Sequence, residues 1–278
     1  MTGYPTSIGS SDESSIHLLG QDLAQDLLGQ VGFAELAFWL VALRRPTPAE
    51  LRVFEAVLVA LADHGLTPSA IAARLTLTGA PESVQGALAA GLLGGGSRYL
   101  GVTEDAGRFL TAAVAAYDRT GADRPTTEDG WDEVARAAIR GQRAGGRYVP
   151  GLGHPEHKLG DPRTPVLMRI AVEEGLFGPH LQLFAAVGRV HPELLGRRLP
   201  LNGAGACGAA LCDLGFPVGI LRGFALLART AGLLGHLAEE LRRPIGQALS
   251  DDVRRATDYQ PPGTSWAEGV THPDPDDP

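Results

Sequence analysis

Between residues 149 and 163 the chain reads Val-Pro-Gly-Leu-Gly-His-Pro-Glu-His-Lys-Leu-Gly-Asp-Pro-Arg. This stretch presents two histidines, a lysine and an arginine on a backbone rich in glycine and proline. Glycine allows the main chain to approach a ligand closely, and Lys158 and Arg163 are suited to charge-assisted hydrogen bonds with phosphate or carboxylate oxygens. We therefore expect a loop that binds an anionic ligand with a reactive oxygen.

The composition is that of a soluble globular enzyme. The chain has 278 residues, of which 44% are hydrophobic and 20% charged, enough for one or two domains with a buried core. The apolar stretches Leu36–Leu43 and Leu51–Ala62 are shorter than the ~20 residues that span a bilayer. Met1–Ser15 lacks the cationic start and apolar run of a secretory signal. The sequence predicts a cytoplasmic protein with no membrane partner.

Charge and cysteine content exclude two further classes. The formal net charge of −8 argues against a nucleic-acid partner, because no extended basic face is available to neutralise phosphates. Cys207 and Cys212 have no other cysteine to complete a zinc site, so they are expected to be small buried residues. We expect no metal.

Apolar residues recur at helical spacing, for example at Phe33, Leu36, Ala37 and Leu40 and again at Leu51, Phe54, Leu58 and Leu61. Helix starts are predicted at Thr47-Pro48, with Glu50 completing a capping box, at Thr67-Pro68 and at Asp161-Pro162. Stops are predicted at glycines that follow apolar runs, some of which are alternatively sites of close helix packing: Gly65, Gly175, Gly215 and Gly235. The fold class is therefore all-α, with little strand.

Two segments are predicted to lack regular structure. The interval Thr120–Gly130 has the composition of a loop. From about residue 256 onward the chain becomes acidic and rich in proline, which is typical of a tail that cannot offset its ordering entropy by burial.

The run Gly203-Ala-Gly-Ala-Cys-Gly208 satisfies the glycine pattern of a dinucleotide-binding turn. That fingerprint also requires a preceding buried strand and an acidic residue about twenty positions later. Neither is present, so we interpret the run as a helix start or a helix pair packed through small residues.

Several motifs occur in an order that resembles the citrate synthase superfamily, and in particular its short citryl-CoA lyase branch, which is similar to the carboxy-terminal module of ATP-citrate lyase. They are Ala62-Asp-His64-Gly-Leu-Thr-Pro-Ser-Ala, the stretch from Gly151 to Lys158, Asp161-Pro-Arg163, Leu201-Asn202 and Ala228-Arg229-Thr-Ala-Gly. The resemblance extends from about Asp12 to Leu249.

The resemblance implies a large helical domain and a smaller mobile helical domain that closes over substrate. The large domain is expected at residues 1–152 and 231–255, the small domain at 153–230, and an acidic proline-rich tail at 256–278. It also implies a homodimer or a higher homo-oligomer.

The same resemblance implies roles for individual residues in the substrate site. His64 is expected to hold a dicarboxylate, and His154 to hydrogen-bond the keto or hydroxyl oxygen. Arg229 and Arg243 are expected to clamp carboxylates, with Arg243 lent by the partner subunit. Open alternatives are a helix-capping role for His64 and a one-residue shift from Arg243 to its neighbour.

Coenzyme A is the expected cofactor, as a thioester substrate. The resemblance places Lys158 and Arg163 at its nucleotide, together with the backbone of Gly151 and Gly153. The other expected ligands are an acyl-CoA and a small di- or tricarboxylic acid.

The chain departs from the family at two positions. Gly94 stands where citrate synthases carry a histidine that stabilises the enol of acetyl-CoA, and Ala204 stands in place of the aspartate that moves the proton at the acetyl carbon. The turn of Gly94, Gly95 and Gly96 is expected to supply oxyanion donors instead. Glu156 and His157 are alternative replacements for the missing acid and base.

Both losses concern enolisation, whereas the residues expected to grip an oxygenated acid are present. Without a placed base, enolate formation is expected to slow by about 10²–10⁴-fold. We therefore hypothesise a lyase that cleaves a 3-hydroxy-3-carboxyacyl-CoA, citryl-CoA or a relative, into an acyl-CoA and a 2-oxo acid. The alternatives are a condensing enzyme, a thioester hydrolase that uses Cys207, or a non-catalytic homologue that binds a CoA ester.

Overall fold

The computed structural model describes residues 3–261. A small antiparallel sheet of β1 (Gly9–Ser11), β2 (Ile16–Leu18) and β3 (Gln21–Asp22) comes first, followed by a π-helical turn at Leu23–Leu27. The helices that follow are α1 (Phe33–Ala42), α2 (Pro48–Ala62), α3 (Pro68–Gly79), α4 (Val84–Leu100), α5 (Val102–Asp118), α6 (Glu128–Ala144), α7 (Arg163–Glu173), α8 (Pro179–Leu195), α9 (Gly203–Asp213), a 3₁₀ turn (Val218–Ile220), α10 (Leu221–Arg242) and α11 (Gly246–Ala256). The predicted all-α class is confirmed.

The predicted starts at Thr47-Pro48 and Thr67-Pro68 are confirmed by their caps, whereas α7 begins one residue later than predicted, at Arg163, without a side-chain cap. The Thr47 side chain accepts a hydrogen bond from the Glu50 backbone N–H, and the Glu50 carboxylate accepts one from the Thr47 N–H, which closes the capping box of α2. Thr67 caps α3 in the same way through the N–H of Ala70. These hydrogen bonds satisfy N–H groups that the first turn of a helix leaves free.

Three local expectations are refined by the structure. Gly235 lies inside α10 and does not end it. The predicted loop Thr120–Gly130 is shorter than expected, because Glu128–Gly130 already form the first turn of α6. Residues 257–261 follow α11 without regular structure, and residues 262–278 of the predicted tail lie outside the described residues.

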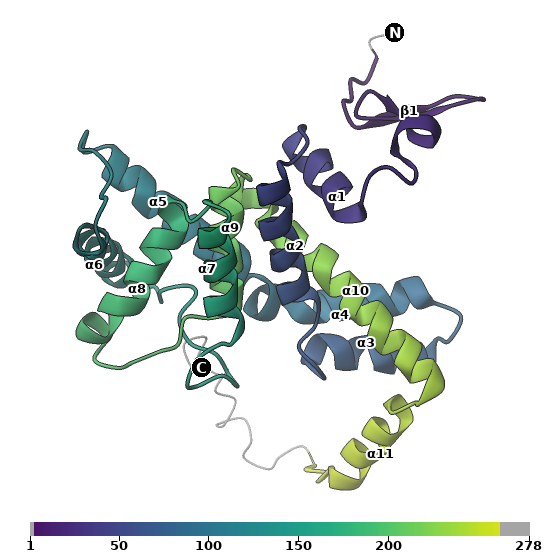
Figure 1. Ribbon diagram of the computed structural model, residues 1–278. Coiled ribbons are helices and arrows are strands. Elements are labelled where there is room, and N and C mark those ends of the chain that lie inside the picture. The colour runs from purple at the N-terminus through teal and green to yellow at the C-terminus, as the bar shows by residue number, and fades with distance from the viewer. Residues whose placement is uncertain (1–2, 262–278) are drawn as a thin grey trace.

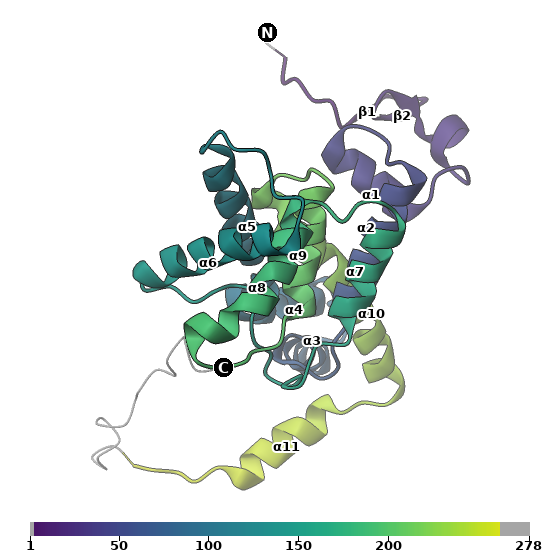
Figure 2. The same ribbon diagram turned by 60° about the vertical axis from the view of Figure 1, so that its left-hand side comes forward.

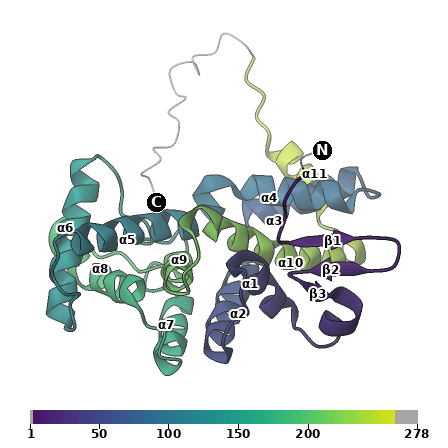
Figure 3. The same cartoon turned by 90° about the horizontal axis from the view of Figure 1, so that it is seen from above.

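Helix α10 links two hydrophobic clusters. Figure 1 shows α5, α6 and α8 on one side of the molecule and α3, α4 and α11 on the other, with α10 extending between them, and Figure 3 shows the same arrangement from above. In the larger cluster four phenylalanine rings pack with centroids 4.5 to 5.6 Å apart: Phe38, Phe54, Phe216 and Phe224. The smaller cluster joins α3 and α4 to the second half of α10.

The predicted division into two domains stays a prediction. Residues of both predicted domains pack in the larger cluster, for example Val53 and Leu183. The boundary near residue 152 therefore passes through one continuous apolar core.

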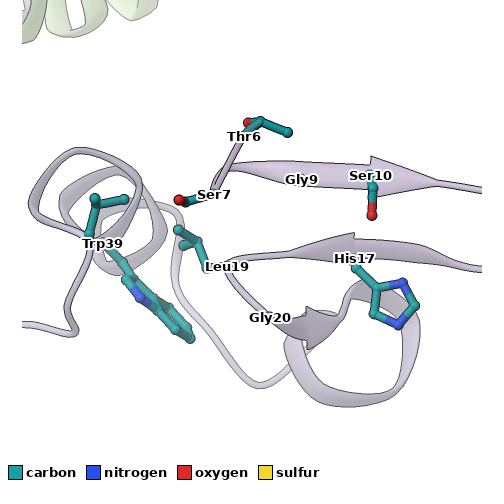
Figure 4. Close-up of a pocket in the computed structure, with 9 residues that line it drawn as sticks. Thr6, Ser7, Gly9, Ser10, His17, Leu19, Gly20 and Trp39 are labelled. Atoms are coloured by element: carbon teal, nitrogen blue, oxygen red, sulfur yellow. The ribbon is translucent and has the colours of Figure 1, made fainter. Parts of the chain in front are cut away.

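The amino-terminal sheet stands beyond α1, away from the rest of the helices (Figure 2). A hollow of about 550 Å³ separates it from α1, and Ser7, Leu19 and Trp39 contribute to its wall (Figure 4). The sequence indicated little strand and did not locate this sheet.

The apolar segment Val218–Arg242 is long enough to span a membrane by length and composition alone. Core helices of soluble proteins pass the same test, and α10 packs against α2, α3, α4 and α5. The absence of a membrane partner was predicted from two other stretches and stays a prediction.

Two glycines of α10 provide a matched test of helix packing. A Cβ at position 232 would contact the carbonyl oxygen of Ala62, where α2 ends, whereas a Cβ at position 235 would meet nothing within 4 Å. We expect Gly232→Ala to lower the free energy of unfolding by about 1–3 kcal/mol because it overpacks this contact. Gly235→Ala should raise it by up to about 1 kcal/mol through helix propensity. Urea denaturation of both variants measures the difference, and equal effects would contradict the packing described.

Candidate active site

The glycine-rich loop is tied to the start of α9. The Asn202 N–H donates to the Gly151 carbonyl at 2.9 Å, and the Asn202 side-chain amide donates to the Gly153 carbonyl at 2.9 Å. The Gly153 N–H donates to the carbonyl of Pro200 at 2.8 Å. Gly151 adopts φ +85°, and a Cβ there would lie 2.5 Å from the ring of Phe184, so both conformation and space require glycine.

These hydrogen bonds engage backbone groups of Gly151 and Gly153 within the protein. A role for the same backbone in binding CoA stays a prediction. The same geometry identifies the run from Gly203 to Gly208 as the start of a helix, as expected, with the Asn202 side chain capping it through the N–H of Gly205 at 2.8 Å.

Three histidine rings pack together at this loop. His64 comes from the connection between α2 and α3, and His154 and His157 come from the loop itself. The ring centroids are 5.1 Å apart for His64 and His154, 5.2 Å for His64 and His157, and 4.4 Å for His154 and His157. The fold thus brings His64 and His154 together, as the sequence predicted, and adds His157.

The protonation of His154 is set by its own loop. The backbone N–H groups of Glu156 and His157 both donate to Nδ1 of His154, at 3.1 and 3.0 Å. A nitrogen that accepts two hydrogen bonds carries no proton, so in the neutral ring the proton is on Nε2. His154 therefore presents an N–H donor to the site.

The surroundings of His154 and His64 disfavour their charged forms. Burial lowers the pKa of His154 to about 4, and the neighbouring His157 adds to this effect. Burial also lowers the pKa of His64, and the positive charge of Arg163 adds to it. At neutral pH the donor on His154 is thus an uncharged imidazole.

Asp161 and Arg163 form a buried ion pair beside the histidines. The Asp161 carboxylate accepts hydrogen bonds from Nε and Nη2 of Arg163, at 2.9 and 2.7 Å, and from the N–H of Gly203 at 2.6 Å. The Arg163 Nη1 donates to the carbonyl of Ala60 at 3.0 Å. Burial alone would raise the pKa of Asp161, but these hydrogen bonds outweigh it and hold the pKa well below its usual range.

Arg163 and Lys158, which the resemblance assigns to the same CoA nucleotide, have different surroundings. Arg163 lies against the histidines, whereas Lys158 is exposed on the loop. Assignment of both to the CoA nucleotide stays a prediction. The sequence identified Asp161 as part of a helix start and of the Asp-Pro-Arg family motif, and that motif is the one local signal of the pair.

Arg229 supplies a cation with unused hydrogen-bonding capacity. Its side chain is 7% exposed, and Nη1 donates to the hydroxyl of Thr67 at 3.4 Å. Its Nε is buried and has no hydrogen-bond partner within residues 3–261. Burial lowers the pKa of Arg229, while Asp63 opposes and Arg163 adds to the effect. A buried guanidinium with an unpaired donor is suited to a carboxylate ligand.

A hydrogen-bonded chain that the sequence did not predict supports the connection carrying His64. Arg74, 2% exposed, donates from Nε to Nδ1 of His236 at 3.3 Å, and Nε2 of His236 lies 2.9 Å from the Asp63 carboxylate. Asp63 also accepts the N–H of Gly65 at 2.8 Å. Asp63, and not His64, therefore makes the side-chain hydrogen bonds of the turn that follows α2.

Arg243 lies far along α10 from the predicted carboxylate ligand Arg229 within one chain. Arg243 is exposed at the end of α10, fourteen residues after Arg229, or about 21 Å along the helix. A shared ligand would therefore require a second subunit, as the sequence predicted, and this role stays a prediction.

Helix α4 is interrupted at Gly96, which adopts φ 48° and ψ −163°, whereas Gly94 and Gly95 lie in the helix before it. A Cβ on Gly94 would lie 3.6 Å from the carbonyl oxygen of Pro68, at the start of α3. The helical turn just before the break thus packs on the start of α3. Oxyanion donors at Gly94, Gly95 and Gly96 stay a prediction.

The histidine cluster fits a metal ion poorly. His64, His154 and His157 each have one ring nitrogen in the cluster, and these three nitrogens lie within 4.8 Å of one another. A metal requires a free lone pair, however, and the lone pair on Nδ1 of His154 already accepts two backbone hydrogen bonds. The prediction that both cysteines are buried is confirmed, and burial raises the pKa of the Cys207 thiol to about 12.

The chain is similar to known proteins in both sequence and structure. Residues 12–247 match the family model described as the C-terminal domain of citrate synthase. The chain is similar to the structure of citryl-CoA lyase from Hydrogenobacter thermophilus, with a TM-score of 0.79 and 31% identity over 93% of this chain and 94% of that chain. It is also similar to ATP citrate lyase from Methanothrix soehngenii in complex with citrate and coenzyme A, with a TM-score of 0.74 and 22% identity over 95% of this chain and 42% of that one.

Sequence relatives include the probable ATP-citrate synthase of Caenorhabditis elegans, 23% identical over 87% of this chain, and an ATP-citrate synthase beta chain of Oryza sativa, 27% identical over 72%. The chain spans 22% and 33% of the lengths of these two relatives. The predicted citrate synthase-like fold and family resemblance are confirmed.

The depressed pKa of His154 predicts a pH-dependent stability. In the folded state the ring takes up a proton only near pH 4, whereas in the unfolded chain it does so near the ordinary value of 6.5. The unfolded state therefore binds more protons between these values, and the free energy of unfolding should fall as pH drops from about 6.5 to about 4. His154→Asn should show a smaller fall in this window. Urea titrations at several pH values measure it, with His17→Asn, at an exposed histidine, as control; identical pH dependence in wild type and His154→Asn would contradict the shift.

Proposed function

Because the chain belongs to the citrate synthase family, we propose that it is a citryl-CoA lyase. The enzyme cleaves a carbon–carbon bond of a 3-hydroxy-3-carboxyacyl-CoA, citryl-CoA or a relative, and releases an acyl-CoA and a 2-oxo acid. The likeness to the Hydrogenobacter thermophilus enzyme over nearly the full length of both chains supports this proposal. The observations that carry it are the fixed N–H donor of His154 and the unpaired donor of Arg229, whose guanidinium bonds Thr67 in the connection that also carries His64.

The Nε2–H group of His154 is suited to stabilise the substrate oxygen on which negative charge develops. As the substrate hydroxyl becomes a carbonyl during cleavage, negative charge passes through its oxygen. A donor that is already oriented and neutral stabilises this charge without reorganising, and the two backbone hydrogen bonds orient Nε2–H in this way. His154 is therefore assigned to polarise the substrate hydroxyl, not to deprotonate it.

Arg229 and Arg163 supply positive charge near the proposed site of the substrate carboxylates. Arg229 has the unpaired Nε, and the Arg163 guanidinium lies near enough to both histidines to lower their pKa values. A citryl group carries carboxylates that require such partners once water is excluded. We assign Arg229 to a substrate carboxylate, with Arg243 of a second subunit as a further clamp in a homodimer or higher oligomer.

The missing enolising residues favour cleavage over synthesis. Gly94 and Ala204 offer no side chain that would remove a proton from an acyl-CoA methyl group. Cleavage begins instead at a hydroxyl, which is a stronger acid than a carbon. The thioester enolate leaves toward the break in α4, where backbone N–H groups of Gly94 to Gly96 are proposed as oxyanion donors. Hydrolysis through Cys207 is disfavoured by its buried thiol.

The reaction predicts a direct assay. Incubation with citryl-CoA should yield acetyl-CoA and oxaloacetate, detected by mass spectrometry. Arg229→Met should lower kcat/KM by about 100-fold, because truncating one partner of a buried charge pair costs about 3 kcal/mol. Arg108→Met, at an arginine 63% exposed on α5, is the matched control and should leave kcat/KM unchanged. Tight binding of citryl-CoA with no products from it or other hydroxyacyl-CoA esters would identify a non-catalytic binder instead.

Lys158 offers a separate test of CoA binding, because it is the only lysine of the chain. An amine-acetylating reagent should modify Lys158, and CoA at ten times its Kd should slow this modification about tenfold, since about a tenth of the sites stay free. Mass spectrometry of the loop peptide measures the rate, and the amino terminus serves as an internal control. Modification that is equally fast with and without CoA would contradict the assignment.

We propose a cytoplasmic location as the default for such an enzyme.

A further inference from the structure

The site described above contains a donor for the reacting oxygen but leaves the acceptor of its proton unassigned. Cleavage of a tertiary alcohol requires that the hydroxyl proton leave as the carbonyl forms. Nδ1 of His154 is covered by two backbone N–H groups, and Nε2 already bears a proton. His154 therefore cannot accept the proton without breaking these hydrogen bonds.

Most other groups at the site are occupied. Asp161 is engaged by Arg163 and by the N–H of Gly203, which makes its carboxylate a weak base. Nε2 of His64 lies 3.5 Å from the Glu156 carboxylate, and burial together with the charge of Arg163 lowers the pKa of His64, which makes its ring a weaker base. Arg163 and Arg229 are cations and cannot accept a proton.

His157 differs from these groups. Its ring is half-buried against the rings of His64 and His154, yet it makes no hydrogen bond to another group within residues 3–261. Its backbone N–H is one of the two that fix the tautomer of His154. The turn that orients the donor therefore also positions a second imidazole beside it.

The spacing suits two groups that share one oxygen. Two nitrogens that each lie about 2.8 Å from a tetrahedral oxygen are about 4.6 Å apart. One ring nitrogen of His154 and one of His157 lie within 4.8 Å of each other, and the ring centroids are 4.4 Å apart. The two imidazoles are therefore close enough to contact the same substrate hydroxyl, which would accept from one ring and donate to the other.

We propose that His157 is the general base of the cleavage, an inference that rests on the proposed function. The hydroxyl proton passes to an unprotonated nitrogen of His157, and the O–H electron pair forms the carbonyl π bond. The carbon–carbon bond breaks, and its electron pair becomes the enolate of the acyl-CoA. The enolate carbon then takes a proton from water, and His157 returns its proton to solvent, so that the cycle is balanced. His157 thereby provides the proton acceptor that positions 94 and 204 lack.

Chemical rescue tests this role. His157→Ala should lower kcat for citryl-CoA cleavage by about 10²–10⁴-fold, the usual contribution of general acid–base catalysis, with KM changed by less than about threefold. Added imidazole should restore the rate in proportion to the concentration of its unprotonated form. The acid limb of the wild-type kcat profile should also be lost in the variant, since that limb reports the base. His17→Ala, at an exposed histidine, is the control and should show neither loss nor rescue.

Different failures have different meanings. His157→Ala that retains wild-type kcat, or that loses kcat without rescue while keeping the pH profile, would overturn the inference and leave the proposed function intact. A wild-type protein that produces nothing from citryl-CoA or other hydroxyacyl-CoA esters would overturn the proposed function itself. If His157→Ala proves unfolded by circular dichroism, His157→Gln keeps a polar side chain of similar size and should show the same loss of kcat and of the acid limb; wild-type values for both would overturn the inference.

Discussion

The site depends on the interactions of the buried Asp161 carboxylate. It binds the guanidinium of Arg163 at the start of α7 and the N–H of Gly203 at the start of α9, and Arg163 in turn reaches the last turn of α2 through Ala60. Three helices are thus connected at the point where the glycine-rich loop ends. Because a carboxylate with no exposed surface must be paired, none of these contacts can be released without a large cost.

Held in this way, the loop controls the chemistry of its own histidine. Two backbone N–H groups of the turn after His154 set the tautomer, and burial together with neighbouring positive charge keeps the ring neutral. A neutral donor aimed at a reacting oxygen serves bond cleavage, in which charge moves through that oxygen. The chain retains this donor, whereas Gly94 and Ala204 lack the side chains that the family resemblance leads one to expect for enolisation.

Helix α10 relates the site to the rest of the molecule. It carries Arg229 on the side that faces the connection between α2 and α3, and His236, two turns later, holds Asp63 in that same connection. Close contact of α10 with the end of α2 at Gly232 permits both interactions. The catalytic connection is thus supported from the second hydrophobic cluster as well as from the first, through the buried charge of Arg74.

The all-α class and the starts of α2 and α3 were predictable from the sequence, which also named His64, His154 and Arg229 as candidates whose roles stay predictions. Helical periodicity and capping depend on residues a few positions apart, and the family motifs lie in short segments, so neither requires knowledge of distant contacts. Three features were decided by the tertiary structure. They are the contacts of Asp161 with Arg163 and Gly203, the position of Arg163 near the histidines, and the packing of the His157 ring against His64 and His154. Tautomers, pKa values and unpaired donors depend on which groups packing brings into a low-dielectric interior, and residues far apart along the chain supply those groups.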